Sequence, residues 1–241
     1  MKGVILAGGL GTRLYPLTRV TNKHLLPVYN KPMIFYPIET LVKAGIDEIM
    51  VVTGGPHCGH FMSILKNGHE LGIKHLEYAY QENEGGIADA LSLAKDFADG
   101  DSVTVILGDN TSDADIVQSV KDFTEGALIF LKEVSDPERF GIATFDPKDS
   151  SKIINITEKP KTPDTNWAVT GVYIYDNQVF DFISQIKPSA RGELEITDVN
   201  NKYVEKGQLV WSELKGYWWD AGTFDTLLEA NNYWAKKANG S

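Results

Sequence analysis

Short apolar segments alternate with amphipathic ones over the first 110 residues of the chain. Strand-length segments are predicted at 2–7, 48–53, 74–80 and 102–107. Helical spacing of apolar residues is predicted at 32–45, in a stretch that ends near 66, and at 87–98. Strands that alternate with helical crossovers favour a parallel sheet that is buried on both faces. Ligands then belong at the carboxyl ends of the strands.

The second half of the chain has a different pattern, with strand-like pieces close together. Strands are predicted at 127–131, 141–145, 152–157 and 169–175, and helices at 194–206 and 224–237. In the first half, Pro32 fits the first turn of the helix at 32–45, and Gly45 ends it. The chain is therefore predicted to be α/β, with a Rossmann-like mixed, mostly parallel central sheet flanked by helices. Its 241 residues form one expected domain, 1–241.

Composition excludes several classes of protein. The formal net charge is −10, which argues against nucleic acid or an anionic membrane surface as a partner. The uncharged stretch 3–12 has ten residues and the longest one, 49–65, has 17, so both are shorter than the ~20 that a membrane span needs. A single cysteine, Cys58, excludes an internal disulfide framework and fits a reducing compartment. A cytoplasmic location is expected.

The charge distribution reverses locally at the amino terminus. Residues 1–38 contain no acidic side chain and five basic ones, whereas the rest of the chain is strongly acidic. A basic, glycine-rich segment on an acidic body is what a site for a polyanion such as a triphosphate requires. Chance clustering of charge is the alternative.

The glycine-rich segment 8–13 is the strongest local signal. Glycines at the end of a strand let backbone N–H groups approach phosphate oxygens, and Arg13 adds a permanent cation. A dinucleotide fingerprint needs a glycine where Leu14 stands and an acid about 20 residues later, but Glu39 is the first acid. A Walker A loop needs Gly-Lys-Ser/Thr where the chain has Gly-Thr-Arg. The pattern thus favours a different phosphate-binding loop over a plain turn.

Two aspartates are candidates for a metal site. Asp109 follows the apolar strand 102–107, and Asp220 follows a pair of tryptophans. Mg²⁺ is bound by one or two carboxylates together with substrate phosphates. A turn-forming aspartate is the alternative for either residue. The crowded residues 57–60, with two histidines and the one cysteine, do not fit a tetrahedral zinc site.

These motifs together resemble the sugar nucleotidyltransferases, in order over nearly the whole chain. The residues that carry the resemblance are 7–14, 22–28, 31–34, 108–110, 158–160, 191–198 and 219–223. The resemblance is to the short form of the branch that acts on dTTP and glucose 1-phosphate. It implies a Mg²⁺-dependent exchange that gives dTDP-glucose and pyrophosphate and that feeds deoxysugar or polysaccharide synthesis. It also implies a nucleotide-binding half, 1–122, and a sugar-binding half, 123–241.

The resemblance assigns roles residue by residue. Arg13, Lys23 and Asp109 would be catalytic, and Asp109 and Asp220 would hold the metal. The nucleotide would be bound by Leu6, Gly8, Gly9, Gly11, Thr12, Arg13, Gln81, Gly86 and Asp109. The sugar phosphate would be bound by Asn110, Gly141, Glu158, Lys159, Val169, Tyr173 and Arg191.

Alternatives stay open at this point. The family often has Ser-Lys-Gln where this chain has Asn-Lys-His at 22–24, and Gly-Leu-Ala-Gln where it has Gly-Ile-Ala-Asp at 86–89. These differences leave the choice between thymine and uracil open, so UTP in place of dTTP is a second hypothesis. A non-catalytic regulatory or binding subunit of the same fold is a third, and a dehydrogenase is the alternative at the level of the fold. No nucleic acid or membrane partner is expected, and a homo-oligomer is left open.

Overall fold

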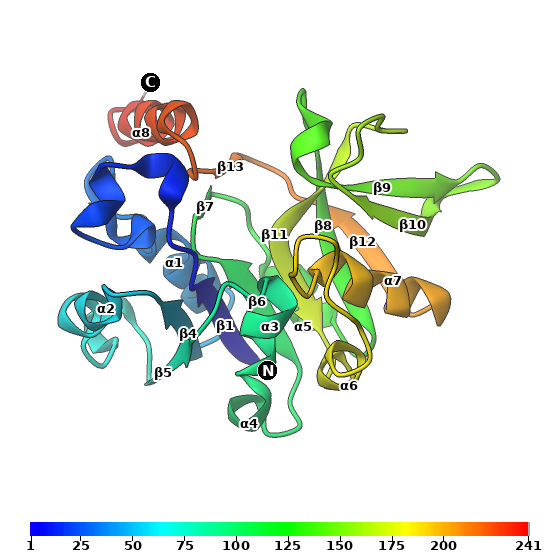
Figure 1. Ribbon diagram of the computed structural model, residues 1–241, viewed down its shortest axis with the longest axis horizontal. Coiled ribbons are helices and arrows are strands. Elements are labelled where there is room, and N and C mark those ends of the chain that lie inside the picture. Colours follow the sequence, from blue (N-terminus) through cyan, green and yellow to red (C-terminus); the bar gives the residue numbers. More distant parts are fainter. Residues whose placement is uncertain (241) are drawn as a thin grey trace. The chain divides into compact units, whose positions relative to one another are not determined.

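The computed structural model describes residues 1–240, which form two compact units (Figure 1). Unit 1 contains residues 1–2, 85–105 and 118–215, and unit 2 contains residues 3–84, 106–117 and the chain from Gly216 onward. Both units are therefore discontinuous in sequence. Residues 85–105 group with the later part of the chain, and the carboxyl-terminal segment groups with the earlier part.

Unit 2 is built on parallel strands, as the alternating pattern predicts. Strands β1 (Lys2–Ala7) and β4 (Glu48–Gly54) pair in parallel, and β4 pairs in parallel with β5 (His75–Gln81) (Figure 1). Helices α1 (Phe35–Lys43) and α2 (Cys58–Leu65) lie between these strands in sequence. The carboxyl ends of all three strands thus meet at one edge.

Small strand pairs and a long helix complete unit 2. Strand β7 (Asn110–Ser112) pairs with β13 (Trp218–Asp220), and β2 (Pro27–Val28) pairs with β3 (Lys31–Pro32). Helix α8 (Phe224–Ala238) begins with a capping box at Thr223. Its buried Ala230 packs in a cluster with Val28, Met33, Tyr36 and Ala221.

Unit 1 is a mixed assembly of strands and short helices. Strand β11 (Trp167–Tyr175) is antiparallel to β8 (Ala127–Glu133) and β9 (Gly141–Asp146), and β9 pairs with β10 (Asp149–Glu158). Strand β12 (Leu209–Glu213) runs parallel to β8. The helices are α3 (Ile87–Ser92), α4 (Lys95–Ala98), α5 (Val117–Asp122), α6 (Val179–Ile183) and α7 (Ile196–Glu205). The unit boundaries cut through β6 (Val103–Leu107) and also separate the first residues of β1 and α5.

Two predicted helices differ from the structure. The helix at 32–45 begins only at Phe35, because Pro32 belongs to strand β3, and Met33 N and Ile34 N donate to the carbonyls of Leu26 and His24 in the turn that follows. The helix at 87–98 is divided into α3 and α4. There the Ser92 hydroxyl donates to the Asp89 carbonyl at 2.6 Å, and tighter i to i+3 bonds replace the α-helical ladder.

Candidate functional site

The glycine loop after β1 lets two side chains approach the backbone closely. A Cβ at Gly8 would lie 2.4 Å from Oε1 of Gln81, and one at Gly11 would lie 2.8 Å from Cβ of Lys23. Gly11 also has a φ of +67°, in the left-handed region. Larger residues would displace Gln81 and Lys23. Glycine is therefore required at this edge, which is where parallel strands present ligands.

Arg13 lies in the single turn Thr12–Leu14 that follows the loop. A Cβ at Gly222 would meet Nη2 of Arg13 at 2.9 Å and Oδ1 of Asp220 at 2.7 Å. The guanidinium and this carboxylate thus converge on Gly222. The segment predicted to carry the cations and the distant Asp220 meet within unit 2.

Lys23 and Asp109 form an ion pair at 2.5 Å between Nζ and Oδ2. Both side chains are nearly buried, at 13% and 14% exposure. Burial by itself raises the pKa of Asp109, but the charge of Lys23 and the hydrogen bonds from Lys23 and Asn110 outweigh it and hold the pKa below its ordinary value. Asp109 is therefore ionised in the folded protein.

Asp109 and Asp220 come from adjacent backbone segments. Asp220 is opposite Asn110 in the β7–β13 pair, and Ala221 N donates to the carbonyl of Asp109 at 3.0 Å. No group of three or more His, Cys, Asp or Glu residues that could hold a metal occurs among residues 1–240. Carboxylates are nevertheless the type of ligand that Mg²⁺ takes, together with phosphate and water oxygens.

Asn110 connects this pair to a tryptophan. Its Oδ1 accepts a hydrogen bond from Trp218 Nε1 at 2.6 Å, and its Nδ2 donates to Oδ1 of Asp109 at 3.1 Å. Asn110 is 3% exposed and belongs to unit 2. It therefore belongs to the unit that contains most of the predicted nucleotide residues, whereas the other predicted sugar-phosphate residues belong to unit 1.

His24 is a residue of this site to which the sequence analysis gave no role. The backbone N and the ring Nδ1 of His24 both donate hydrogen bonds to Oδ1 of Asn22, at 3.0 and 2.6 Å. Burial and then the neighbouring Lys23 lower the pKa of His24 to about 3, so the imidazole is neutral and Nδ1 carries its proton. A Cβ at Gly108 would lie 2.8 Å from His24 Cδ2. His24 thus packs against Gly108 close to Lys23 and Asp109, and the Asn-x-His spacing was the signal that could have found it.

In unit 1 a second cluster gathers at the ends of β9 and β10. Glu158 is opposite Gly141 in the β10–β9 pair. A Cβ added to Gly141 would lie 3.2 Å from Thr197 Oγ1 and 3.4 Å from Glu158 Oε2. Lys159 follows with a φ of +44°, and its N donates to the carbonyl of Phe140 at 3.0 Å. A lysine in the left-handed region is strained, and such strain concentrates at functional positions.

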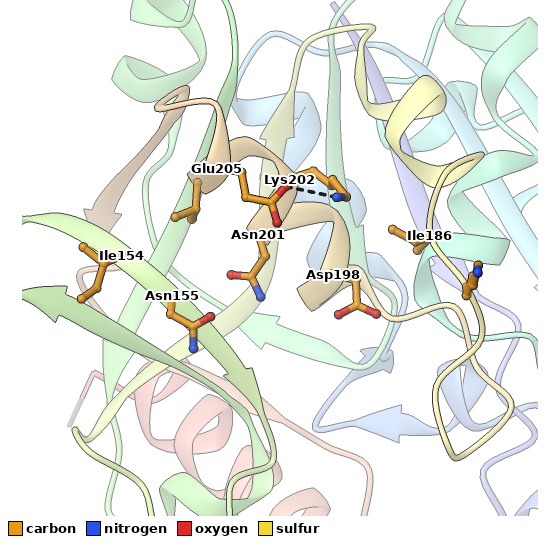
Figure 2. A pocket seen from close by; sticks show the side chains of 9 residues that line it. Ile154, Asn155, Ile186, Asp198, Asn201, Lys202 and Glu205 are labelled. Carbon is orange, nitrogen blue, oxygen red and sulfur yellow. Dashed lines mark hydrogen bonds and ion pairs between the residues drawn. The ribbon is translucent and has the colours of Figure 1, made fainter.

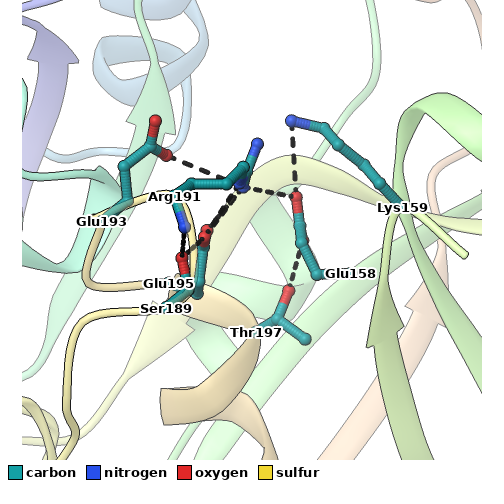
Figure 3. Close-up of polar contacts among 7 residues, drawn as sticks. All are labelled: Glu158, Lys159, Ser189, Arg191, Glu193, Glu195 and Thr197. Carbon is teal, nitrogen blue, oxygen red and sulfur yellow. Dashed lines mark hydrogen bonds and ion pairs between the residues drawn. The ribbon is translucent and has the colours of Figure 1, made fainter.

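Arg191 joins this cluster from the loop before α7 (Figure 3). Its Nη2 is 2.8 Å from Glu195 Oε2 and 3.4 Å from Glu158 Oε1. Glu158 Oε2 accepts from the Thr197 hydroxyl at 2.6 Å, and Lys159 Nζ lies 3.5 Å from Oε1. Two cations and two carboxylates thus share one partly exposed cluster.

The other predicted residues of unit 1 lie in its framework. Val169 and Tyr173 are buried in β11, on either side of a register shift against β8. Gly86 precedes α3 with a φ of +96°, and a Cβ there would lie 2.6 Å from the Leu194 carbonyl. Gly86 therefore belongs to unit 1, whereas the other predicted nucleotide residues belong to unit 2.

A pocket of about 570 Å³ in unit 1 contains none of the predicted site residues (Figure 2). It is lined by residues of β10, of the loop after α6 and of α7. Some of its polar side chains already have partners. Asn201 bonds the backbone of Ile156 at 2.8 and 2.9 Å, and Lys202 pairs with Glu205 at 3.1 Å.

Two further expectations concern residues 57–60 and the membrane. The rings of His57 and His60 stack with centroids 5.2 Å apart and form part of no metal-binding cluster within residues 1–240. Across the same residues, no helix combines the length and the apolar sequence needed to cross a membrane.

Comparison with known proteins bears on both the fold and the family. A curated relative from Neisseria meningitidis, named glucose-1-phosphate thymidylyltransferase, is 44% identical over 97% of this chain and 82% of its own length. Another of the same name, from Xanthomonas campestris, is 44% identical over 96% of this chain and 80% of its own length.

Solved structures give the same result. A Bacillus anthracis protein, provisionally named glucose-1-phosphate thymidylyltransferase and solved with a sucrose, matches with a TM-score of 0.91 and 50% identity over 97% of this chain and 94% of its own. UDP-glucose pyrophosphorylase with UDP-glucose matches with a TM-score of 0.85 at 23% identity, over 98% of both chains, and shows the fold alone. The predicted mixed, mostly parallel sheet flanked by helices is thereby confirmed.

The family model described as nucleotidyl transferase matches residues 2–237, nearly the whole chain. The family predicted from the motifs is confirmed, and this chain belongs to the nucleotidyl transferases.

Proposed function

We propose that this protein transfers a deoxythymidylyl group from dTTP to glucose 1-phosphate and forms dTDP-glucose and pyrophosphate. Relatives that carry the corresponding name are 40–45% identical over nearly all of this chain. One observation carries the proposal within the molecule. The buried Lys23–Asp109 pair lies beside a glycine loop at a sheet edge where three parallel strands end.

Unit 2 supplies the groups for the nucleotide. Backbone N–H groups of the loop, which includes Gly8, Gly9 and Gly11 and continues to Thr12, would donate to phosphate oxygens. Arg13 would neutralise the triphosphate with a forked cation. Lys23 would stand beside the α-phosphate, since its Nζ lies at Asp109 and its stem packs on the loop. Leu6 at the end of β1 and Gln81 at the end of β5 would contact the nucleoside.

Mg²⁺ is the divalent ion that the two carboxylates of unit 2 would suit. Asp109 and Asp220 would hold it, and when bound it would neutralise charge on the phosphates. In the structure Lys23 partners Asp109. Asn110 donates a hydrogen bond to Oδ1 of Asp109, and Lys23 Nζ donates one to Oδ2 of the same carboxylate.

Unit 1 supplies the groups for the sugar phosphate. Glu158 would accept hydrogen bonds from sugar hydroxyls, and Gly141 opposite it leaves room for the ring. Lys159 and Arg191 would bind the phosphate. Val169 and Tyr173 would form the apolar wall, and Gly86 would let the base approach the backbone.

The chemistry is a direct displacement at the α-phosphorus of dTTP. An oxygen of the sugar phosphate forms the new P–O bond, and pyrophosphate leaves as the bond from the α-phosphorus to its bridging oxygen breaks. No covalent link to the protein is needed, so positioning and neutralisation of charge carry the catalysis. Loss of one cation at the reacting phosphate is expected to cost about 10²–10³ in rate, by analogy with an oxyanion donor.

Pyrophosphate release tests the proposal most directly. The protein is assayed with Mg²⁺ and glucose 1-phosphate, with dTTP, UTP, CTP and ATP in parallel. A preference for dTTP supports it, and a preference for UTP favours the uridylyltransferase. A folded protein that is silent with all four nucleotides contradicts the proposal and favours a non-catalytic subunit. Galactose 1-phosphate serves as the matched acceptor control, because it differs from the glucose compound at one hydroxyl.

A further inference from the structure

Arg191 is held along one edge of its guanidinium by a single, nearly buried carboxylate (Figure 3). We infer that Glu195 is a positioning residue that fixes Arg191 so that its remaining edge is presented to the phosphate of the sugar substrate. This inference rests on the proposed function, and it assigns to Glu195 a role apart from substrate contact.

The contact pattern is specific to one edge of the guanidinium. Nε of Arg191 donates to Glu195 Oε1 at 3.2 Å, and Nη2 donates to Oε1 and Oε2 at 2.9 and 2.8 Å. Nη1 makes no hydrogen bond to any of residues 1–240. Because the five N–H donors form a rigid planar fork, fixing the Nε–Nη2 edge also fixes the direction of Nη1.

Glu195 itself has little freedom to move. Its side chain is only 10% exposed, against 41% for Arg191, and its backbone is the extended residue that precedes α7. The hydroxyl of Ser189 donates to Oε1 at 2.7 Å and accepts from Arg191 N at 3.2 Å. Ser189 N also donates to the carbonyl of Glu193 at 2.9 Å, which closes the loop on itself. The carboxylate is thus a fixed support rather than a mobile partner.

The neighbouring carboxylates hold Arg191 more loosely. Glu158 lies at 3.4 Å and Glu193 at 3.6 Å from Nη2, and neither is bidentate. Glu193 is 38% exposed, so water screens its charge. Bidentate, charge-assisted bonds to a sheltered carboxylate are the stronger kind. Glu195 therefore determines where the guanidinium lies.

A carboxylate so close to a phosphate-binding cation could also compete with the phosphate. The geometry favours positioning, because Glu195 occupies the Nε–Nη2 edge and leaves the Nη1 side open. If competition dominated, removal of the charge would strengthen binding of the sugar phosphate. The two roles therefore predict opposite shifts in affinity for the same substitution.

The test compares Glu195→Gln with the matched control Glu193→Gln, which removes an equal charge from the same loop. We expect Glu195→Gln to raise KM and the calorimetric Kd for glucose 1-phosphate about tenfold, with the KM for dTTP unchanged. Loss of a charge-assisted hydrogen bond costs this order of affinity. Glu193→Gln should shift either value less than about twofold. An unchanged or lower Kd in folded Glu195→Gln overturns the inference.

Ser189→Ala keeps every charge and tests the support separately. It should raise the Kd for glucose 1-phosphate about threefold, in line with loss of a neutral hydrogen bond. It also decides the question if Glu195→Gln does not fold, and an unchanged Kd in Ser189→Ala then overturns the inference. Failure of the proposed function looks different, because the wild-type protein would then release no pyrophosphate with any nucleotide.

Discussion

The charged clusters of the two units differ in how they are held. In unit 2, Lys23 and Asp109 are nearly buried, lie at the ends of core strands and are fixed by backbone and amide contacts. In unit 1, Arg191 and Lys159 are 41% and 48% exposed and are oriented by other side chains. Buried charges interact strongly and cannot be altered without cost to the fold, whereas exposed ones can. Function and stability should therefore be coupled at the buried Lys23–Asp109 pair of unit 2 and separable at the exposed cations of unit 1.

The largest effect is expected from Asp109→Asn. Turnover should fall by roughly 10³, because the variant removes both a proposed metal ligand and the partner of Lys23. The free energy of unfolding should fall by about 3 kcal/mol, because a sheltered cation loses its counter-charge. Pyrophosphate release and urea denaturation measure the two effects. Asp115→Asn, which breaks an exposed pair with Lys43, is the control and should change neither. A stable, active Asp109→Asn protein would contradict the coupling.

Arg13→Ala should separate function from stability within unit 2. The side chain is exposed, so the free energy of unfolding should change by less than about 0.5 kcal/mol. Turnover with dTTP should still fall by about 10²–10³. The control is Arg19→Ala, since Arg19 is also exposed and stacks on the ring of Tyr15. Equal activity of the two variants would remove Arg13 from the site.

Acid should destabilise the protein through His24. The pKa of His24 is about 3 in the folded chain and near 6.5 when unfolded, so the unfolded state binds one more proton between these values. The stabilising contribution of the neutral imidazole is complete above pH 6.5. It falls by about 1 kcal/mol per pH unit as the pH decreases toward 3.

Denaturation at pH 7, 5.5 and 4.5 measures this dependence. His24→Gln, which does not titrate, should be flatter over that range, and His69→Gln on an exposed turn is the matched control. Asp109 adds its own loss only below about pH 3.8, because its pKa is lowered from that value. Parallel curves for the wild type and His24→Gln would exclude the buried histidine as the cause.

The smallest effect on activity is expected from Lys159→Gly. Glycine adopts a φ of +44° without the steric penalty of a side chain, so relief of strain should offset its greater unfolded-state entropy. The free energy of unfolding should stay within about 1 kcal/mol of the wild type, while the KM for glucose 1-phosphate rises about tenfold. Lys152→Gly in the exposed part of β10 is the control and should weaken only stability. A large loss of stability with unchanged KM would make Lys159 structural.

Local sequence signals predicted which strands and helices carry the candidate site residues. They predicted the first and last residues of these elements less well. The strand that ends at Ala7 and the glycines after it were readable, because an apolar run and a glycine-rich turn are both local features. Strands β7 and β13 were not predicted, since each has three residues and is defined only by its partner. The late start of α1 and the division between α3 and α4 likewise depend on hydrogen bonds that compete with the helix.

The sequence by itself determined the α/β class, the acid-free opening segment and the identity of the candidate cations and carboxylates, because composition, period and motif spacing are properties of the chain. Only the tertiary structure decided that the backbone of Asp220 lies beside Asn110 in the β7–β13 pair, that His24 is buried and neutral, and that Glu195 holds Arg191. These are contacts, burial and protonation. They depend on distances between segments that pattern along a chain does not encode.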